Sequence, residues 1–318
     1  MSHKLIVIII TLISLHLSSQ GYNDIDEVVS NFPTKFKSIQ DFATKINESF
    51  STDLEKTRAV YYWISNNIAY DFEALKNKKN YFSYDSEDEL INKMKILSEK
   101  VLKRKKAVCE GYSQLLKFTL KELNIECEVI NGYAKKYTTD IGRKRNGSNH
   151  AWNCVKLNGK WQLIDATWST GFSDENNKHF KFNDMYFLID PEKLILTHLP
   201  NNPERQFLNT PIKKESFFSL PVFFSEYYNS GLKINHKTMG LIKAKENDTI
   251  KLIFDKADEN RFYRYALKNN SFTTPFLFER EQDGYTAFIP IESKRSTSLT
   301  LYNDNGFAIL EFKILIEK

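Results

Sequence analysis

Three residues of types that suit acyl-transfer chemistry occur in order along the chain. Cys109 stands in "KAVCEGYSQLL", His150 begins "HAWNCVKL", and Asp165 ends "KWQLID". A thiol, an imidazole and a carboxylate can serve as nucleophile, general base and orienting group. The chemistry depends on whether the surrounding elements bring the three side chains together.

Residues 150–165 predict a β-hairpin. Asn158-Gly159 is the strongest short signal for a two-residue hairpin turn, and it lies between two runs of strand-like residues. Such a turn pairs Leu157 with Lys160. This pairing fixes the register of the whole hairpin.

In that register Trp152 lies opposite Asp165, and Asp165 is the diagonal neighbour of His150. His150, Trp152 and Cys154 share one face, because side chains alternate along a strand. Diagonal neighbours are about 7–8 Å apart at the backbone, within reach of side chains that lean toward each other. We therefore expect the carboxylate to accept the Nδ1 proton of the imidazole.

Cys109 is predicted at the start of a helix that runs to about Leu123 and ends at Asn124. The positive end of a helix dipole favours a thiolate, and a nearby imidazolium lowers the thiol pKa further. The basic run 103–106 is expected to be a solvated loop that adds little to this effect. The helix dipole and the histidine therefore carry the predicted activation.

Structural roles are the alternative for each of these residues. A lone cysteine at a helix start usually packs without reacting, and a lone histidine on a strand is usually core or surface. The ordered set of three favours catalysis. Trp152 and Trp168 are expected to pack rather than bind substrate. Cys127 and Cys154 are interpreted as small buried residues, and any native disulfide is expected to join these two.

Length and composition favour a globular protein of about two domains. The chain has 318 residues, of which 41% are hydrophobic, and a net charge of +5. Short basic runs such as Arg143-Lys144-Arg145 lack interleaved aromatics and any nucleic-acid motif. We expect no nucleic-acid partner.

Residues 1–19 predict an export signal. Lys4 precedes an apolar run from Leu5 to Leu17, and small residues follow at Ser18 and Ser19. The run is short for a membrane span, although a short membrane anchor is the alternative. The mature chain is expected to lack a membrane segment and to be periplasmic or secreted.

The rest of the chain divides into a mixed part and a strand-rich part. Residues 22–50 predict helices with a break near Pro33, and Thr52 and Glu55 form a capping-box pattern. A loop is expected over 76–89 and a helix over 90–103. We expect one domain over 20–210, a linker around 200–221, and a β-sandwich-like domain of unknown role over 211–318.

Several motifs together resemble the transglutaminase-like superfamily, on the branch that includes kyphoscoliosis peptidase. They are "TRAVYYWISNNIAYD", "VCEGYSQLLKFTLKELNIECEVINGYAK", "HAWNCVKLNGKWQLIDATWSTG" and "YFLIDPEKLILTHLPNNPERQFL". The resemblance covers about 50–210. It implies a papain-like α+β fold, helices packed on an antiparallel sheet, with Cys109, His150 and Asp165 as catalytic triad. One departure is Ala107, where the family usually has glycine, and its methyl is expected to crowd the substrate backbone or shift the loop.

The sequence therefore predicts an exported, cysteine-dependent acyl-transfer enzyme, a peptidase or transglutaminase-type enzyme acting on peptide or protein amide bonds. No cofactor or metal is expected, since no Cys/His cluster has ligand spacing. The alternative is a non-catalytic interaction module that uses the same groove to bind protein. Arylamine acetyl transfer uses the same triad but matches poorly outside it. The sequence fixes no oligomeric state.

Overall fold

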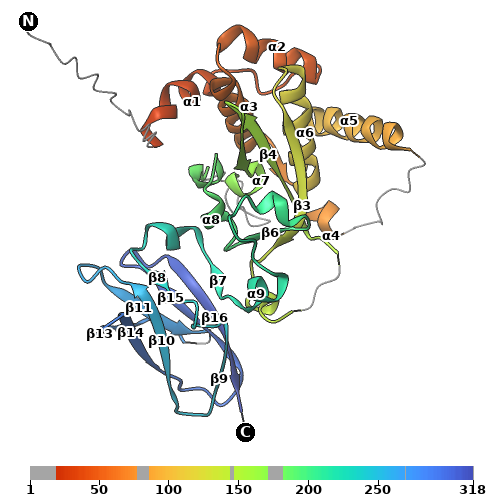
Figure 1. The fold of residues 1–318 in the computed structure, drawn as a ribbon. Coiled ribbons are helices and arrows are strands. Elements are labelled where there is room, and N and C mark those ends of the chain that lie inside the picture. Colours follow the sequence, from red (N-terminus) through yellow and green to blue (C-terminus); the bar gives the residue numbers. More distant parts are fainter. Residues whose placement is uncertain (1–18, 77–85, 144–146, 171–181, 269, 318) are drawn as a thin grey trace, which may run out of the picture.

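The computed structural model describes residues 19–76, 86–143, 147–170, 182–268 and 270–317 (Figure 1). The predicted export signal therefore lies outside the described residues, apart from Ser19, and so does most of the predicted loop over 76–89. Within the described ranges, none of the helices is both long enough and apolar enough to cross a membrane.

The N-terminal part is helical, and its helices start where the sequence supplies caps. The side chain of Ser38 accepts a hydrogen bond from Asp41 N, and the predicted capping box of Thr52 and Glu55 is present. The predicted break falls between the first two helices. The helices are α1 (Asn23–Ser30), α2 (Ile39–Ser49), α3 (Asp53–Asn67), α4 (Phe72–Lys76), α5 (Glu87–Arg104) and α6 (Cys109–Glu122).

A four-stranded antiparallel sheet follows, with the strand order β5-β4-β3-β6. Its strands are β3 (Cys127–Ala134), β4 (His150–Leu157), β5 (Lys160–Ile164) and β6 (His198–Pro200). The predicted hairpin is confirmed: Leu157 pairs with Lys160, and Asn158 and Gly159 have φ of 50° and 76°. Positive φ at both central residues is what a type I′ turn requires.

The two faces of this sheet pack into different cores. Val155, Leu157 and Ile164 join the core that contains the apolar residues of α2, α3 and α6. Figure 1 shows α6 lying along β3 and β4. Trp152 and Cys154 point to the opposite face, where α8 (Pro191–Leu194) and the 3₁₀-helix η3 (Asp184–Tyr186) cover them. The helix α6 is thus held against the strand that carries the histidine.

Cys127 and Cys154, the pair expected to join if the chain forms any native disulfide, are not placed to do so. Cys127 pairs with Val155 across β3 and β4 and packs toward the helical core, whereas Cys154 belongs to the core on the other face. Side chains on opposite faces of a sheet cannot meet in a disulfide. All three cysteines are free thiols.

The stretch expected to be a linker contains ordered structure. The 3₁₀-helix η4 (Pro203–Gln206) and α9 (Lys214–Ser219) lie within it. Phe217 and Phe218 on α9 are buried against Tyr133 and other apolar residues. Only part of the stretch is therefore exposed chain.

The C-terminal part consists of two sheets around one apolar core, as the alternating strands predict. One sheet has the order β13-β14-β10-β8, and the other has β12-β11-β15-β16-β7, with β9 paired in parallel to β16. Leu252 and Ile289 from the first sheet meet Leu301 and Phe312 from the second. The strands of the two C-terminal sheets are β7 (Val222–Phe223), β8 (Lys233–Ile234), β9 (Leu241–Ala244), β10 (Thr249–Lys256), β11 (Tyr263–Leu267), β12 (Thr274–Phe276), β13 (Phe278–Glu281), β14 (Gly284–Pro290), β15 (Thr297–Tyr302) and β16 (Ala308–Ile316). The protein is thus α+β, with a sandwich-like C-terminal part.

Candidate active site

Cys109 is the first residue of α6, as the sequence predicts. The preceding strand β2 (Lys106–Ala107) pairs in parallel with β1 (Ala69–Tyr70), and Asp71 N donates to Ala107 O at 2.8 Å. The expected solvated loop over 103–106 is wrong, because the last turn of α5 and the first residue of β2 occupy it. A strand on one side and a helix on the other therefore fix the position of the thiol.

Ala107, whose methyl is expected to crowd the substrate backbone or shift the loop, has that methyl turned toward the first turn of α6, and its effect on a substrate stays a prediction. The residue is buried, and its Cβ points at Gly111 in the first turn of α6. A Cβ placed on Gly111 would come within 2.7 Å of the Ala107 Cβ and 2.9 Å of Val101 Cγ2. The glycine therefore makes room for the alanine methyl on the core side of the helix.

His150 and Asp165 meet as the hairpin register predicts, but through a different ring nitrogen. His150 Nε2 lies 2.6 Å from Asp165 Oδ2, whereas the expectation was a bond from Nδ1. Both side chains are buried. With Nε2 engaged by the carboxylate, Nδ1 is the nitrogen that remains for the thiol.

Asp165 is held by its neighbours in the chain as well as by histidine. It caps α7 (Ala166–Ser169), where its Oδ1 accepts hydrogen bonds from Thr167 N at 2.8 Å and Trp168 N at 3.0 Å. Burial acts to raise the pKa of this carboxyl, but the positive charge and hydrogen bond of His150 hold it far below its usual range. Asp165 is therefore ionised and fixed in orientation.

The thiol and the imidazole shift each other's protonation in opposite directions. Burial raises the pKa of the Cys109 thiol, yet the hydrogen bond and charge of His150, aided by the Ala151 backbone, bring it below its ordinary value. Burial lowers the pKa of His150, but the Asp165 charge and hydrogen bonds to Asp165 and Cys109 raise it to about 9. These directions favour a thiolate–imidazolium pair near neutral pH.

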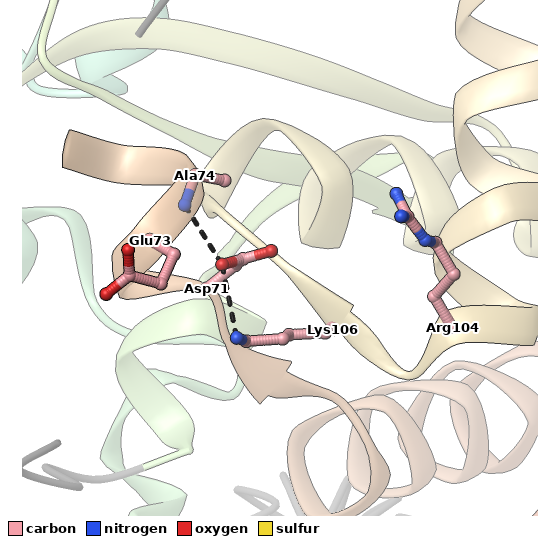
Figure 2. Close-up of a pocket in the computed structure, with 5 residues that line it drawn as sticks. All are labelled: Asp71, Glu73, Ala74, Arg104 and Lys106. Carbon is pink, nitrogen blue, oxygen red and sulfur yellow. Dashed lines mark hydrogen bonds and ion pairs between the residues drawn. The ribbon is translucent and has the colours of Figure 1, made fainter. Parts of the chain in front are cut away.

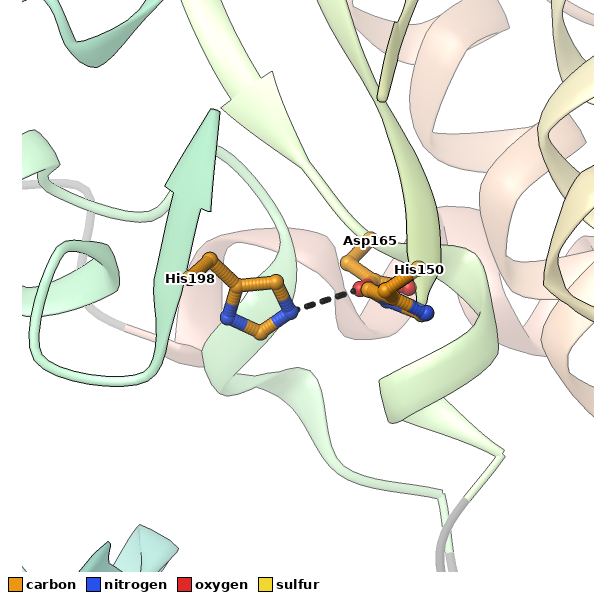
Figure 3. A group of neighbouring side chains, drawn as sticks. All are labelled: His150, Asp165 and His198. Carbon is orange, nitrogen blue, oxygen red and sulfur yellow. Dashed lines mark hydrogen bonds and ion pairs between the residues drawn. The ribbon is translucent and has the colours of Figure 1, made fainter. Parts of the chain in front are cut away.

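A second histidine at the site was not found from the sequence. His198, in β6, is buried, and its Nε2 lies 3.1 Å from the same oxygen, Oδ2, of Asp165 (Figure 3). It comes from a segment 33 residues beyond Asp165. No spacing rule connects the two; the only sequence signal is a histidine inside the apolar run "LILTHLP".

Aromatic rings enclose the two imidazoles. Trp152 stacks on His150 with ring centroids 5.8 Å apart, and Trp168 meets the His198 ring edge-on at 4.4 Å. The Lys136 ammonium lies over the outer part of this layer, 4.7 Å from the Trp168 ring centroid. The expectation that the two tryptophans pack is confirmed, and what they pack against is the histidine pair.

The two histidines and Asp165 also have to be tested as a metal site. One ligand atom from each of these three residues lies within 4.8 Å of the other two. An ion would sit about 2.0–2.2 Å from each ligand atom. The 2.6 Å separation of His150 Nε2 and Asp165 Oδ2 is instead that of a direct hydrogen bond. The donors and acceptors of this cluster are thus matched to each other.

A surface pocket of about 440 Å³ lies beside β1 and β2 (Figure 2), and neither imidazole is among the residues that line it. It is lined by Asp71, Glu73, Ala74, Arg104 and Lys106. Asp71 accepts from Ala74 N at 3.0 Å and pairs with Lys106 at 3.3 Å. Because the central carboxylate is already paired within the pocket, we assign it no role in the chemistry.

Comparison with known proteins identifies the class. Residues 40–166, which include all three predicted site residues, match the family model of the transglutaminase-like superfamily. This part of the chain is a domain of that superfamily. Within the superfamily, the chain falls in the kyphoscoliosis-peptidase-like branch.

The relatives are distant and much longer than this chain. Kyphoscoliosis peptidase from Homo sapiens is 29% identical over 234 residues, which are 73% of this chain and 33% of that protein. Cytokinesis protein 3 from Schizosaccharomyces pombe is 28% identical over 250 residues, 71% of this chain and 26% of that protein. The chain thus spans about a third or less of the length of these relatives.

A solved structure, the crystal structure of a TGase, aligns with 56% of this chain and 40% of its own, at 19% identity and a TM-score of 0.29. A likeness this low identifies no residue. The family assignment therefore rests on the sequence match.

Proposed function

We propose that this protein is a cysteine-dependent acyl-transfer enzyme that acts on peptide or protein amide bonds through Cys109, His150 and Asp165. The observation that carries the proposal is the connected series of thiol, imidazole and carboxylate, in which the thiol pKa is lowered and the imidazole pKa is raised to about 9. A thiolate that exists at neutral pH is the nucleophile this reaction needs.

The reaction begins with attack of the Cys109 thiolate on the carbonyl carbon of the substrate amide. The first N–H groups of a helix have no carbonyl partner within the helix. Those at the start of α6 are therefore suited to stabilise the oxyanion that develops on the substrate. The His150 imidazolium gives its Nδ1 proton to the leaving amine as the C–N bond breaks, and a thioester remains. Neutral His150 then takes a proton from water or from an acceptor amine, whose attack releases the thiolate.

Hydrolysis is the outcome we propose for the thioester. Two relatives carry the name peptidase, and the resemblance of motifs is to their branch. Transfer to an amine uses the same intermediate and differs only in the acceptor. Substrate and acceptor therefore have to be found together by experiment.

A non-catalytic binding role is the second candidate. The relatives named cytokinesis protein 3 carry the name of a cellular process rather than of a reaction. In that case the surface around Cys109 binds a protein segment without turnover. The linked protonation of Cys109 and His150 favours the enzyme over this alternative.

One experiment separates the two. Wild type, Cys109→Ala and, as matched control, Cys127→Ala are incubated with a peptide library, and cleavage, deamidation and cross-links are identified by mass spectrometry. We expect products from wild type and Cys127→Ala only, since burial raises the pKa of the Cys127 thiol. Brief treatment with iodoacetamide at pH 6 should label Cys109 first. Absence of products together with unreactive Cys109 would favour the binding module.

We also propose that the protein acts outside the cytoplasm. Lys4, the apolar run Leu5–Leu17 and the small residues after it support an export signal. Expression with the natural N-terminus and intact-mass measurement of the exported protein tests this. We expect cleavage near Ser19 or Gln20, and an exported protein that retains Met1 would contradict it.

The two-domain organisation, with a boundary near residue 210, is likewise a proposal. The apolar core of the C-terminal sheets is built from residues beyond Val222, apart from partly buried Leu196 and Leu220 at its edge. Most residues over 209–216 are exposed. Limited proteolysis should cut there and release a C-terminal fragment; stable fragments cut inside 109–168 would refute the boundary.

A further inference from the structure

His198 is connected to the site at both of its ring nitrogens. It begins β6, which pairs with β3 through Ala134 and His198. Its Nε2 lies 3.1 Å from Asp165 Oδ2, and its Nδ1 lies 2.8 Å from Thr197 Oγ1. Asp165 Oδ2 is thus shared by two imidazoles, from β4 and β6 (Figure 3).

The partners of His198 determine its tautomer. Thr197 Oγ1 is 3.2 Å from Leu194 O and only 2.8 Å from His198 Nδ1. If the hydroxyl donated to Leu194 O, a neutral His198 would carry its proton on Nδ1 and turn the bare Nε2 toward the carboxylate. That arrangement is repulsive, so the hydroxyl donates to Nδ1, and Nε2–H donates to Asp165.

The surroundings keep His198 neutral. Burial lowers its pKa most; the Asp165 hydrogen bond acts against this, and the positive charges of His150 and Lys136 act with it, so that the pKa falls to about 4. The His150 and His198 ring centroids are only 5.2 Å apart. The positive charge of the two imidazoles therefore resides on His150, while His198 remains a neutral donor.

We propose that His198 is a positioning residue: its Nε2–H donates to Asp165 Oδ2 and thereby divides the negative charge of that carboxylate between two imidazoles. Its hydrogen bonds go to Thr197 and Asp165 and not to the thiol, so it acts on the site through Asp165. Any effect of His198 on turnover rests on the proposed function, whereas its effect on the pKa of His150 does not.

The consequence follows from counting the donors on Asp165. Oδ1 accepts from two backbone N–H groups and Oδ2 from two imidazoles. Removing the His198 donor leaves Oδ1 anchored, so the carboxylate stays in place, but Oδ2 keeps only His150. Its charge is then less neutralised, and the imidazolium form of His150 is favoured more strongly. Cys109, the other charged group that acts on His150, is unchanged by this substitution, and so is Lys136, whose charge interacts with Asp165 and Cys109.

The test compares His198→Met with His198→Gln. Both side chains are unbranched and similar in length, and only the glutamine amide can donate to Asp165 from near the place of Nε2. The pKa of His150 is measured by NMR titration of its ring proton in histidine-labelled protein, assigned with His150→Gln. We expect the pKa to rise by roughly 0.5–1 unit in His198→Met and to return to the wild-type value in His198→Gln.

Two results overturn the proposal: an unchanged His150 pKa in His198→Met, or the same shift in both variants. If His198→Met does not fold, the ¹⁵N shifts of wild-type His198 decide. We expect the neutral Nε2–H form between pH 6 and 8, and finding the Nδ1–H form or the imidazolium refutes the inference. Neither measurement uses a substrate. A protein without turnover but with the predicted shifts would thus refute the proposed function alone.

Discussion

The region before residue 210 and the C-terminal sandwich differ in what they bury. Among the described residues, the first region buries six acidic, basic or histidine side chains, and the sandwich buries none of these types. Its buried polar side chains are hydroxyls and one amide, such as Thr286, Ser298 and Asn303. The six buried residues of these types are Arg58, Lys135, Asp140, His150, Asp165 and His198.

Burying an ionisable group opposes folding unless other groups compensate. The compensation is of two kinds here. Arg58 is paired with Asp26 and Asp184 and lies 4.7 Å from the Tyr22 ring centroid, an arrangement that holds α1 and α3 together without any nucleophile. The group around Asp165 instead includes an imidazole, His150, that lowers the pKa of a neighbouring thiol, Cys109. Burial of charge alone therefore does not mark a site; coupling to a nucleophile does.

The largest effect at the site is expected from Asp165→Asn. The amide keeps the size but removes the charge that raises the His150 pKa, so the imidazolium and with it the thiolate are disfavoured. We expect turnover to fall on the order of 10²-fold, or about 2.7 kcal/mol. The pH dependence of Cys109 alkylation measures the thiolate directly.

In wild type the thiolate should persist below about pH 6, and in Asp165→Asn its apparent pKa should rise. Circular dichroism controls for folding. If turnover and alkylation both remain as in wild type, the triad assignment is wrong.

The contact between His150 and Asp165 could be predicted from the sequence because a local rule links the two residues. The Asn158-Gly159 turn fixes the register, and the register brings Asp165 to His150. The helix start at Cys109 followed from periodicity in the same way. Which nitrogen of His150, Nδ1 or Nε2, meets Asp165 could not be predicted correctly from the sequence, because it depends on the orientation of the ring and not on the strand register.

His198 and the environment of Ala107 could not be found because they depend on packing between distant segments. His198 reaches Asp165 only because β6 pairs with β3. Ala107 is turned inward because Gly111, four residues later, leaves space for its methyl. The placement of Cys127 and Cys154 could not be predicted for the same reason. The pairing of β3 with β4 determines that their side chains point to opposite faces of the sheet.

A tenfold effect, intermediate in this series, is expected from Gly111→Ala. The new methyl would press on Ala107 and Val101 and displace the first turn of α6, which carries the thiol. We expect Cys109 alkylation to slow by about tenfold, because misplacing a reacting group by less than 1 Å is already costly. Adding Ala107→Gly removes the closer contact and should restore part of the rate. No recovery in the double variant would show that the two residues do not act as a pair.

A smaller effect at the site, but a clear one on stability, is expected from Lys135→Met. Lys135 Nζ donates to Phe217 O at 2.8 Å and Leu220 O at 2.9 Å, which ties the end of β3 to α9. Burial lowers the pKa of Lys135 to about 7. Between pH 7 and 10.5 the unfolded chain therefore holds a proton that the folded chain lacks, and the free energy of unfolding increases with pH.

Lys135→Met should remove this slope, at most about 1.4 kcal/mol per pH unit. Urea unfolding between pH 7 and 9.5 measures it, with the exposed Lys193→Met as matched control. Alkylation of Cys109 should change less than about twofold, since Lys135 contacts none of the three proposed catalytic residues. Equal slopes in wild type and Lys135→Met would mean that the buried amine is charged in the folded state.

The smallest effect at the site is expected from Tyr263→Phe in the sandwich core. The Tyr263 hydroxyl donates to Ser230 O at 2.7 Å, and both residues are buried. Its loss should lower the free energy of unfolding by about 1–2 kcal/mol, the cost of leaving a buried carbonyl without its donor. Tyr228, by contrast, donates to Lys193 O, in the segment that leads to His198. Replacing it could therefore disturb the site, which makes it unsuitable for this comparison. The sandwich buries no acidic, basic or histidine side chain among its described residues, so Tyr263→Phe has no buried charge through which to act on Cys109. The pH profile of Cys109 alkylation in this variant should coincide with that of wild type from pH 5 to 9. A shifted profile would show that packing in the sandwich reaches the thiol, and the contrast between the two regions would then be one of composition and not of role.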